Sequence, residues 1–173
     1  PQTNTKSRKL FNPFPGLRPF TIAESHLFFG REGQSEEVLS NLSKNRFVAV
    51  VGSSGSGKSS LMYCGVVPIL HGGFITEAGS KWKIIPSRPG NDPIGNLAKG
   101  IAEATNAEDG QKVNTKLIRA ILNSNSQGLT EAIKHTQKDS DQNYLILADQ
   151  FEELFRFRKK QDDLDAANEA FAY

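Results

Sequence analysis

Several features that mark particular classes of protein are scarce or missing in this sequence. There is one cysteine, Cys64, so no internal disulfide bond can form, which fits a reducing compartment such as the cytoplasm. Apolar runs are short, and none approaches the roughly 20 residues that a membrane-spanning helix needs. No secretory signal pattern is visible either. We therefore expect a cytoplasmic protein without a membrane segment.

A large net charge is also lacking. The chain has 21 lysines and arginines against 19 aspartates and glutamates, which gives a net charge of +2. Proteins that bind nucleic acids or membrane surfaces usually carry a clear basic surplus, so neither partner is indicated. Hydrophobic residues make up 37% of the 173 residues, as in an ordinary soluble domain with one core.

The most informative stretch is a short apolar run followed by a glycine-rich loop. Residues 47–51 read Phe-Val-Ala-Val-Val, which is typical of a strand buried on both faces. Residues 52–59 then match the phosphate-binding pattern G-x-x-x-x-G-K-[ST], known as Walker A. A Gly/Ser-rich linker is the alternative, but linkers do not usually lie directly between an apolar strand and a helix. The order of strand, loop and helix therefore predicts a phosphate site.

This loop predicts a set of nucleotide contacts. The residues expected to bind the phosphates are Gly52, Ser53, Ser54, Gly55, Ser56, Gly57, Lys58, Ser59 and Ser60. Glycine permits the positive φ angles of such a loop, and its successive N–H groups form a concavity for anions. Lys58 would reach the β- and γ-phosphates as a catalytic cation, and the Ser59 hydroxyl would ligate Mg²⁺. The expected ligand is ATP or ADP with Mg²⁺.

A second apolar run ends in an acidic residue. Residues 144–148 read Tyr-Leu-Ile-Leu-Ala, and Asp149 follows directly. In phosphate-loop enzymes an acid at this Walker B position holds Mg²⁺ through water, so Asp149 is the expected metal-side acid. Glu152 and Glu153 both compete for the role of activating the attacking water. They also suit the first turn of a helix, where the dipole favours acids, so the choice stays open.

The region before the loop begins with an unusual composition. Residues 1–10 are polar and basic, which predicts a disordered end. Residues 11–20 contain three prolines and three phenylalanines, which favours an extended arm laid over the domain with its aromatic rings in grooves. A proline-rich ligand for another domain is the alternative. Thr21 with Glu24 then predicts a capping box at the start of a short helix.

A turn and a helix follow the arm. Gly30 marks the turn, and residues 32–42 have helical spacing of apolar side chains. Arg31 lies between them. We consider a role beside the nucleotide for Arg31, with an ordinary surface cation as the alternative.

The rest of the chain alternates between strand and helix patterns. A strand is expected over 81–85, ended by Pro86. Helices are expected over 58–67, 93–102, 114–123, 128–138 and 162–173. This alternation predicts an α/β fold with a mostly parallel sheet.

Several segments together resemble a known family, the novel STAND NTPases. The resemblance rests on Asn12 to Phe20 (NPFPGLRPF), Phe28 to Glu32 (FFGRE), the phosphate loop, Arg88-Pro89-Gly90 with Asp92-Pro93, and Asp149 to Phe155 (DQFEELF). It covers nearly all of residues 11–171. The fold that it implies is a P-loop NTPase three-layer sandwich.

The resemblance also implies a function. Members of the family are ATP-dependent signalling switches, with effector domains and sensor repeats elsewhere in the same chain, so these domains and nucleotide-dependent self-association are the expected partners. By the resemblance, Gly30 and Arg31 would lie near the adenine and ribose. Asp149 would be the acid on the Mg²⁺ side, and Glu152 or Glu153 the catalytic acid.

The family has a sensor strand and a winged-helix module farther along the chain, and these residues contain neither. We therefore expect an NTPase core over 47–173 that is truncated after the Walker B strand and preceded by an arm and helix over 11–46. The strands over 47–51 and 144–148 would flank an empty position and expose unpaired backbone groups. Such a piece is expected to bind nucleotide without efficient turnover.

Two other functions remain open for the same loop. A metabolic kinase or other phosphoryl transferase would need an acceptor site and an arginine-bearing lid, for which Arg156 and Arg158 are the only nearby residues. A scaffold would bind nucleotide and do no chemistry. Turnover assays with and without phosphate acceptors separate these functions from an ATPase.

Overall fold

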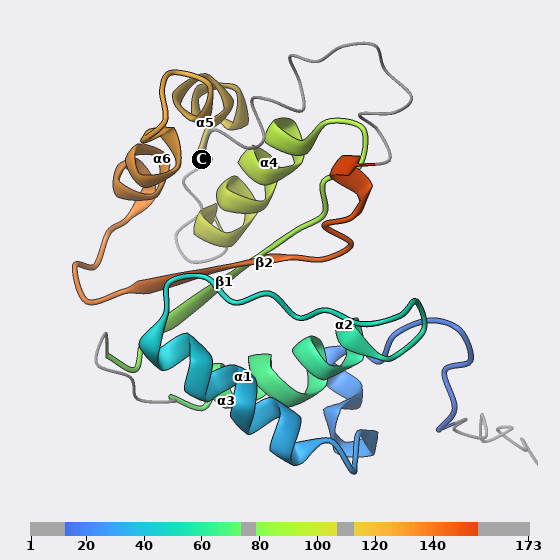
Figure 1. The fold of residues 1–173 in the computed structure, drawn as a ribbon. Helices are drawn as coiled ribbons and strands as arrows, with labels where there is room; N and C mark the ends of the chain where they lie inside the picture. Colours follow the sequence, from blue (N-terminus) through green and yellow to red (C-terminus); the bar gives the residue numbers. More distant parts are fainter. Residues whose placement is uncertain (1–12, 74–78, 107–112, 156–173) are drawn as a thin grey trace, which may run out of the picture. The chain divides into compact units, whose positions relative to one another are not determined.

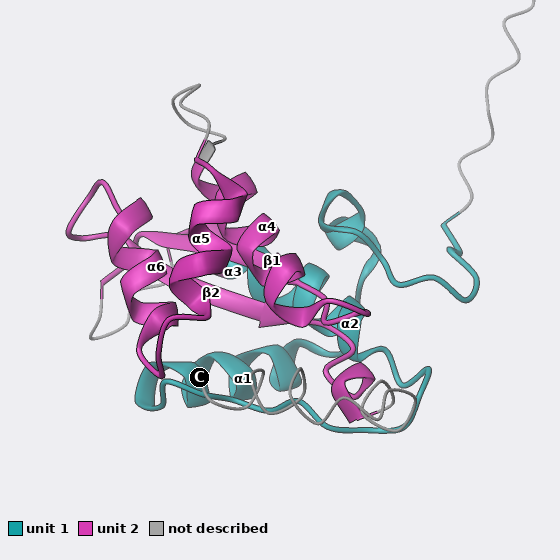
Figure 2. Cartoon of the chain, turned by 90° about the horizontal axis from the view of Figure 1, so that it is seen from above, with its two compact units in different colours: residues 1–69 teal, residues 70–173 magenta. Residues whose placement is uncertain are grey.

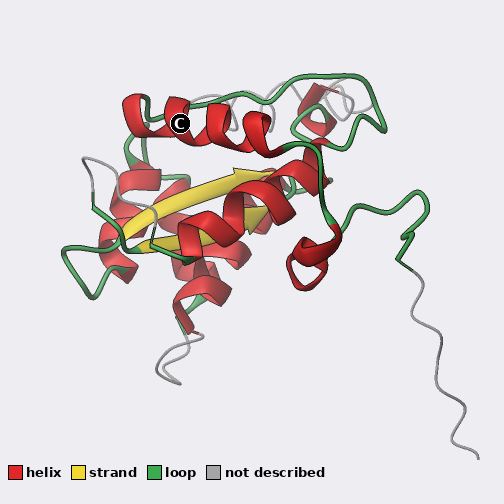
Figure 3. Cartoon of the chain, turned by 90° about the horizontal axis from the view of Figure 1, so that it is seen from below, coloured by secondary structure: helices red, strands yellow, loops and turns green. Residues whose placement is uncertain are grey.

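The computed structural model describes residues 13–73, 79–106 and 113–155 (Figure 1). The chain divides into two compact units, Pro1–Ile69 and Leu70–Tyr173 (Figure 2). Helices make up most of the regular structure (Figure 3). Within the described ranges, no helix combines the length and apolar character that crossing a membrane requires.

Helical segments form the first unit. A 3₁₀-helix, η1 (Ile22–Leu27), precedes the α-helix α1 (Glu32–Lys44). Three consecutive segments then follow the glycine-rich loop, and the last one continues into the second unit. They are α2 (Lys58–Ser60), the π-helical η2 (Leu61–Val66) and α3 (Val67–His71). Both η1 and α1 pack against η2, so the helix after the loop is the centre of this unit.

The packing of α1 against η2 depends on a glycine. A Cβ atom at Gly65 would lie only 2.1 Å from the Ser35 hydroxyl oxygen. Ser35 is buried on the face of α1 that also buries Val38 and Leu39. The two helices therefore approach each other more closely than a residue with a side chain would allow. This contact anchors the helix that carries the loop.

The strand expected over residues 47–51 is not formed, and that prediction is wrong. The structure assigns these residues no strand pairing, Phe47 is 78% exposed and Val51 is 88% exposed. An apolar, β-branched run becomes a buried strand only where neighbouring strands bond to it. In the described residues, the paired strands are 82–87 and 143–148, and Gly79 forms an isolated bridge. The exposed apolar side chains are in line with the expectation that this run lacks a neighbour.

A parallel pair of strands and three helices form the second unit. Strand β1 (Trp82–Ser87) pairs in parallel with β2 (Asn143–Ala148), with Ile85 opposite Ile146. The connection between them contains α4 (Pro93–Asn106), α5 (Thr115–Leu122) and α6 (Gly128–Thr136). Helix α4 packs on β1, and both α5 and α6 contact α4. The three helices lie together on one side of the strands (Figure 1).

One apolar core holds this unit together. It consists of the buried side chains Ile85, Ile94, Ala98, Ile101, Ile118, Leu122 and Ala132. Pro86 does not end the strand, as the sequence led us to expect, because β1 continues through it to Ser87. Proline lacks an N–H donor and is tolerated where a strand is bonded on one side. Within the described residues, β1 is bonded to β2 alone.

The α/β class and the parallel pairing are confirmed. The helices expected after residues 92, 113 and 127 are present, and α4 extends four residues beyond the expected end, to Asn106. A complete three-layer sandwich is not present in the ranges that the structure describes. The expected disordered end over 1–10 and the expected helix over 162–173 lie outside those ranges.

Candidate functional site

The glycine-rich loop has positive φ angles at two of its three glycines. Gly55 and Gly57 have φ angles of 77° and 82°, in the left-handed region that glycine adopts without steric penalty. Gly57 is the N-cap of α2, and its carbonyl accepts the first helical hydrogen bond from the Leu61 N–H at 2.8 Å. The loop therefore leads directly into a helix.

Lys58 closes the loop on itself. Its Nζ donates to the carbonyl oxygens of Gly52 and Ser53 at 2.9 and 3.0 Å. The Ser56 N–H also donates to the Ser53 carbonyl, at 3.2 Å. A Cβ atom at Gly52 would lie 3.0 Å from the Ser56 hydroxyl oxygen, so the first glycine leaves room for this closure. The ammonium group is thus bound to the backbone at the start of its own loop.

The donors of the loop fit a phosphate. Among the described residues, the backbone N–H groups of Gly55, Gly57 and Lys58 donate to no protein acceptor. The loop is mostly exposed, carries one cation and contains no carboxylate that would repel an anion. Free N–H donors beside a lysine ammonium at a helix start form a typical anion site. The residues present therefore fit the phosphates of a nucleotide.

The same residues fit a nucleotide-bound Mg²⁺. Within residues 13–73, 79–106 and 113–155 there is no cluster of three or more His, Cys, Asp or Glu side chains that could hold a metal. A nucleotide-bound Mg²⁺ needs no such cluster, because it takes one or two protein oxygens and fills its other positions with phosphate and water. The Ser59 hydroxyl, at the start of α2, is a suitable oxygen.

Arg31 lies against the loop. It is the N-cap residue of α1, and its Nη1 donates to the Ser56 carbonyl at 2.6 Å. Its Nε donates to the side chain of Gln34 in the first turn of α1. A Cβ atom at Gly57 would lie 3.0 Å from Nη1, so the guanidinium and the loop backbone are in close contact. Arg31 is therefore more than a surface cation, because it joins α1 to the loop.

Gly30 begins this connection. Its φ angle is 80°, which turns the chain from the preceding segment into α1. Its N–H donates to the Glu32 carboxylate at 2.9 Å. Gly30 and Arg31 thus lie in the same unit as the loop. Their contact with an adenine or ribose remains a prediction.

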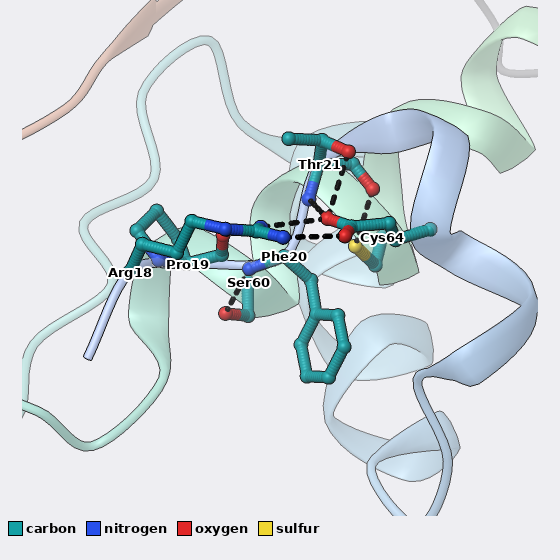
Figure 4. A network of polar contacts seen from close by, with 7 residues as sticks. Arg18, Pro19, Phe20, Thr21, Ser60 and Cys64 are labelled. Carbon is teal, nitrogen blue, oxygen red and sulfur yellow. Dashed lines mark hydrogen bonds and ion pairs between the residues drawn. The ribbon is translucent and has the colours of Figure 1, made fainter. Parts of the chain in front are cut away.

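The segment before η1 is attached to the helix after the loop (Figure 4). The Phe20 N–H donates to the Ser60 hydroxyl oxygen at 3.1 Å, and the Cys64 thiol donates to the Thr21 carbonyl at 3.2 Å. Burial raises the pKa of the Cys64 thiol, which suits a packing role. Ser60, which we expected among the phosphate-binding residues, is buried and accepts a bond from the N-terminal segment.

Glu24 organises this segment. Its carboxylate accepts the Thr21 N–H and hydroxyl, each at 2.9 Å, and so makes the reciprocal bond of the expected capping box. It also forms a two-bond ion pair with Arg18 at 2.8 and 2.6 Å. The Arg18 bonds, followed by those from Thr21, lower the pKa of Glu24 to about 2. The acid therefore stays ionised throughout the physiological range.

The aromatic arm is less docked than expected. Phe14 is 78% exposed and Leu17 is fully exposed. Phe20 is partly buried, and its ring meets that of Phe28 edge-on with 6.3 Å between the centroids. The prediction of anchored rings is thus wrong for Phe14 and holds for Phe20, while Phe11 lies outside the described residues.

The three candidate acids lie in one turn of the second unit. The Asp149 N–H donates to the Ser87 carbonyl at 2.9 Å, which extends the pairing of β1 and β2 by one bond. Gln150 has a φ angle of 56°, and its N–H donates to the Asp149 carboxylate at 3.0 Å. The Glu153 N–H then donates to the Gln150 carbonyl at 2.9 Å. The chain therefore turns sharply directly after the strand.

The structure separates the two glutamates, which the sequence left equal. Glu153 is 8% exposed, and its carboxylate accepts bonds from the side chain of Arg88 and from the Gly90 N–H. Glu152 is exposed and makes no side-chain hydrogen bond or ion pair with another described residue. Sequence reasoning missed the role of Arg88 and Gly90. The Arg-Pro-Gly run in the family resemblance was the signal that could have identified them.

Comparison with known proteins places the whole region in one family. The family model described as Novel STAND NTPase 1 matches residues 13–172. This range includes the glycine-rich loop and the turn that carries Asp149, Glu152 and Glu153, which we call the acidic turn. No curated protein matches the chain, and no solved structure matches it.

Proposed function

The chain belongs to the Novel STAND NTPase 1 family, and on this premise we propose that residues 52–60 bind ATP or ADP with Mg²⁺. The proposal is supported most directly by the loop, in which two glycines are left-handed and the Lys58 ammonium donates to two backbone carbonyls. Lys58 exchanges its carbonyl acceptors for β- and γ-phosphate oxygens when nucleotide binds. The Ser59 hydroxyl ligates the metal.

The proposed reaction is hydrolysis of the γ-phosphate in the full-length protein. Bound Mg²⁺ supplies charge stabilisation at the transferring phosphoryl group. Asp149, at the end of β2, acts on the metal side through water. Glu152 orients and deprotonates the attacking water, because its carboxylate is exposed and makes no bond to another described residue. Turnover then resets a signalling switch, with effector and sensor domains in the same chain as partners.

Calorimetric titration with Mg-ATP tests the binding site. Lys58→Ala should weaken binding roughly 10- to 100-fold, since a phosphate loses a charge-assisted hydrogen bond. Lys44→Ala is the matched control, because Lys44 is an exposed lysine at the end of α1 in the same unit. Equal affinity in the parent and both variants would show that the loop is not the nucleotide site.

Assays of ATP turnover by the full-length protein test the reaction. Glu152→Gln should keep the affinity for ATP and lower kcat by roughly 100-fold or more, because general-base catalysis is lost. ATP binding without phosphate release in the parent would favour the nucleotide-binding scaffold. Phosphate transfer to an added acceptor in preference to water would favour a kinase.

A further inference from the structure

One carboxylate in the acidic turn is bound from the segment that joins β1 to α4. Arg88 Nε donates to both oxygens of Glu153, at 3.0 and 3.1 Å, and its Nη2 bonds to Oε1 as well. The Gly90 N–H donates to Oε2 at 3.1 Å. We call Arg88, Gly90 and Glu153 the Glu153 clamp. Both carboxylate oxygens are occupied in a site where the glutamate is 8% exposed.

The clamp is fixed to a helix. Asn96, in the first turn of α4, donates from Nδ2 to the Pro89 carbonyl at 2.8 Å. Gly90 has a φ angle of 55°, and a Cβ atom there would lie 3.0 Å from Asn96 Nδ2. The start of α4 is itself capped by Asp92, which accepts the Gly95 N–H at 3.1 Å. The segment that carries these donors is therefore attached to a helix whose inner face belongs to the core.

The acidic turn is thus held at two points. The bond from Asp149 N–H to the Ser87 carbonyl holds its beginning, and the clamp holds Glu153 four residues later. Between these points Gln150 is left-handed, a conformation that a non-glycine residue keeps only when its surroundings impose it. The clamp therefore adds a side-chain attachment at the far end of the turn that carries Asp149 and Glu152.

We propose that Glu153 is a positioning residue, which acts with Arg88 and Gly90 to hold Asp149 and Glu152 for the reaction proposed above, on which this inference rests. A carboxylate that gives both oxygens to an arginine cannot take a proton from water without weakening that pair. Glu153 is therefore the wrong acid for the attacking water. Its exposed neighbour Glu152 is presented by the turn that the clamp fixes.

Hydrogen exchange of the nucleotide-free full-length protein tests the clamp itself. Arg88→Ala should speed the exchange of amides in residues 150–155 by about fivefold or more, since the turn loses its second attachment. Lys81→Ala is the matched control, because Lys81 is also a half-exposed cation in an ion pair, with Asp139, at the opposite end of β1 from Arg88. Exchange in 150–155 should be unchanged in Lys81→Ala.

Measurements of ATP turnover by the full-length protein test whether the clamp positions Asp149 and Glu152. Arg88→Ala and Glu153→Gln should each lower kcat roughly 10- to 100-fold with KM for ATP little changed, because a misplaced catalytic group mainly slows the chemical step. Added guanidinium ion should restore part of the activity of Arg88→Ala and none of that lost in Glu153→Gln, which lacks the carboxylate that the ion would bind. The Arg88 side chain is 59% exposed, so the free ion has access to Glu153. A purely structural ion pair would not produce this selective rescue.

Three results would overturn the inference. Hydrogen exchange and kcat equal to those of the parent in Arg88→Ala would show that the clamp neither stabilises the acidic turn nor supports turnover. Full turnover in Glu152→Gln with none in Glu153→Gln would make Glu153 the base. If the parent binds no ATP, the proposed function fails and the positioning role with it, whereas an active parent with unaffected clamp variants refutes the positioning role alone.

Discussion

Substitution of Gly100 by alanine should destabilise the second unit, even though alanine is the better helix former. Gly100 lies within α4 where the helix crosses β1. A Cβ atom there would lie 2.7 Å from the Pro86 carbonyl oxygen and 3.3 Å from Ile85 Cγ2. Ile85 is fully buried and the Pro86 carbonyl belongs to the backbone, so neither can move away from the added methyl group unless β1 shifts. That strand leads directly to Arg88.

The two opposing effects have different sizes. Alanine gains about 1 kcal/mol over glycine in a helix interior. Overpacking a well-packed site costs typically about 1–3 kcal/mol, and a contact with backbone belongs in the upper part of that range. The net loss should be about 1–2 kcal/mol. For a chain of this size, that corresponds to a fall in Tm of roughly 2–8 °C.

Thermal unfolding followed by circular dichroism measures this effect. Gly33→Ala is the control, because Gly33 lies in α1 and, apart from the backbone of its own helix and its two chain neighbours, no atom lies within 4 Å of the position that its Cβ would take. Its Tm should stay the same or rise, since only the helix preference changes. A Gly100→Ala protein that melts at or above the parent temperature would refute the contact between α4 and β1.

Three further outcomes are expected. Ser60→Ala should lower stability by about 1 kcal/mol in urea unfolding, because the partly buried Phe20 N–H loses its acceptor. A parent-like midpoint would contradict that contact. The pKa of Glu24 is lowered to about 2 in the folded chain, so its contribution to stability should be complete above its unfolded pKa of 4.5 and decline as the pH falls toward 2. Arg18→Ala should flatten this decline in acid titration, and an unchanged curve would exclude the ion pair as its cause. Phe14→Ser should change Tm very little, because the ring is exposed. A large fall in Tm would instead support the prediction that the arm is docked.

Local features were predictable from the sequence. The glycine-rich loop, the capping box of Thr21 and Glu24, and the apolar spacing of α4, α5 and α6 depend on residues close together in the chain. Asp92 before Pro93 likewise indicated where α4 begins. These elements form where propensity, capping and periodicity all agree.

Features that depend on distant partners were not predictable. Residues 47–51 have the composition of a buried strand, but composition does not supply the neighbour that a strand needs. Pro86 was expected to end β1, although the end depends on which edge of the strand is bonded. Glu152 and Glu153 are adjacent and identical in type, and only the approach of Arg88, 65 residues earlier than Glu153, distinguishes them.

The π-helical geometry of η2 has a consequence for the length of this part of the chain. A π-turn accommodates about one residue more than an α-turn. Loss of one residue between Leu61 and Val66 can therefore be absorbed by tightening to α-geometry, with α2 still joined to α3. The preceding loop differs, because separate backbone or side-chain roles belong to Gly55, Gly57 and Lys58. A deletion in the loop therefore cannot be compensated by a change of helix geometry. In related chains, single-residue gaps in alignments are expected in η2 rather than in the loop.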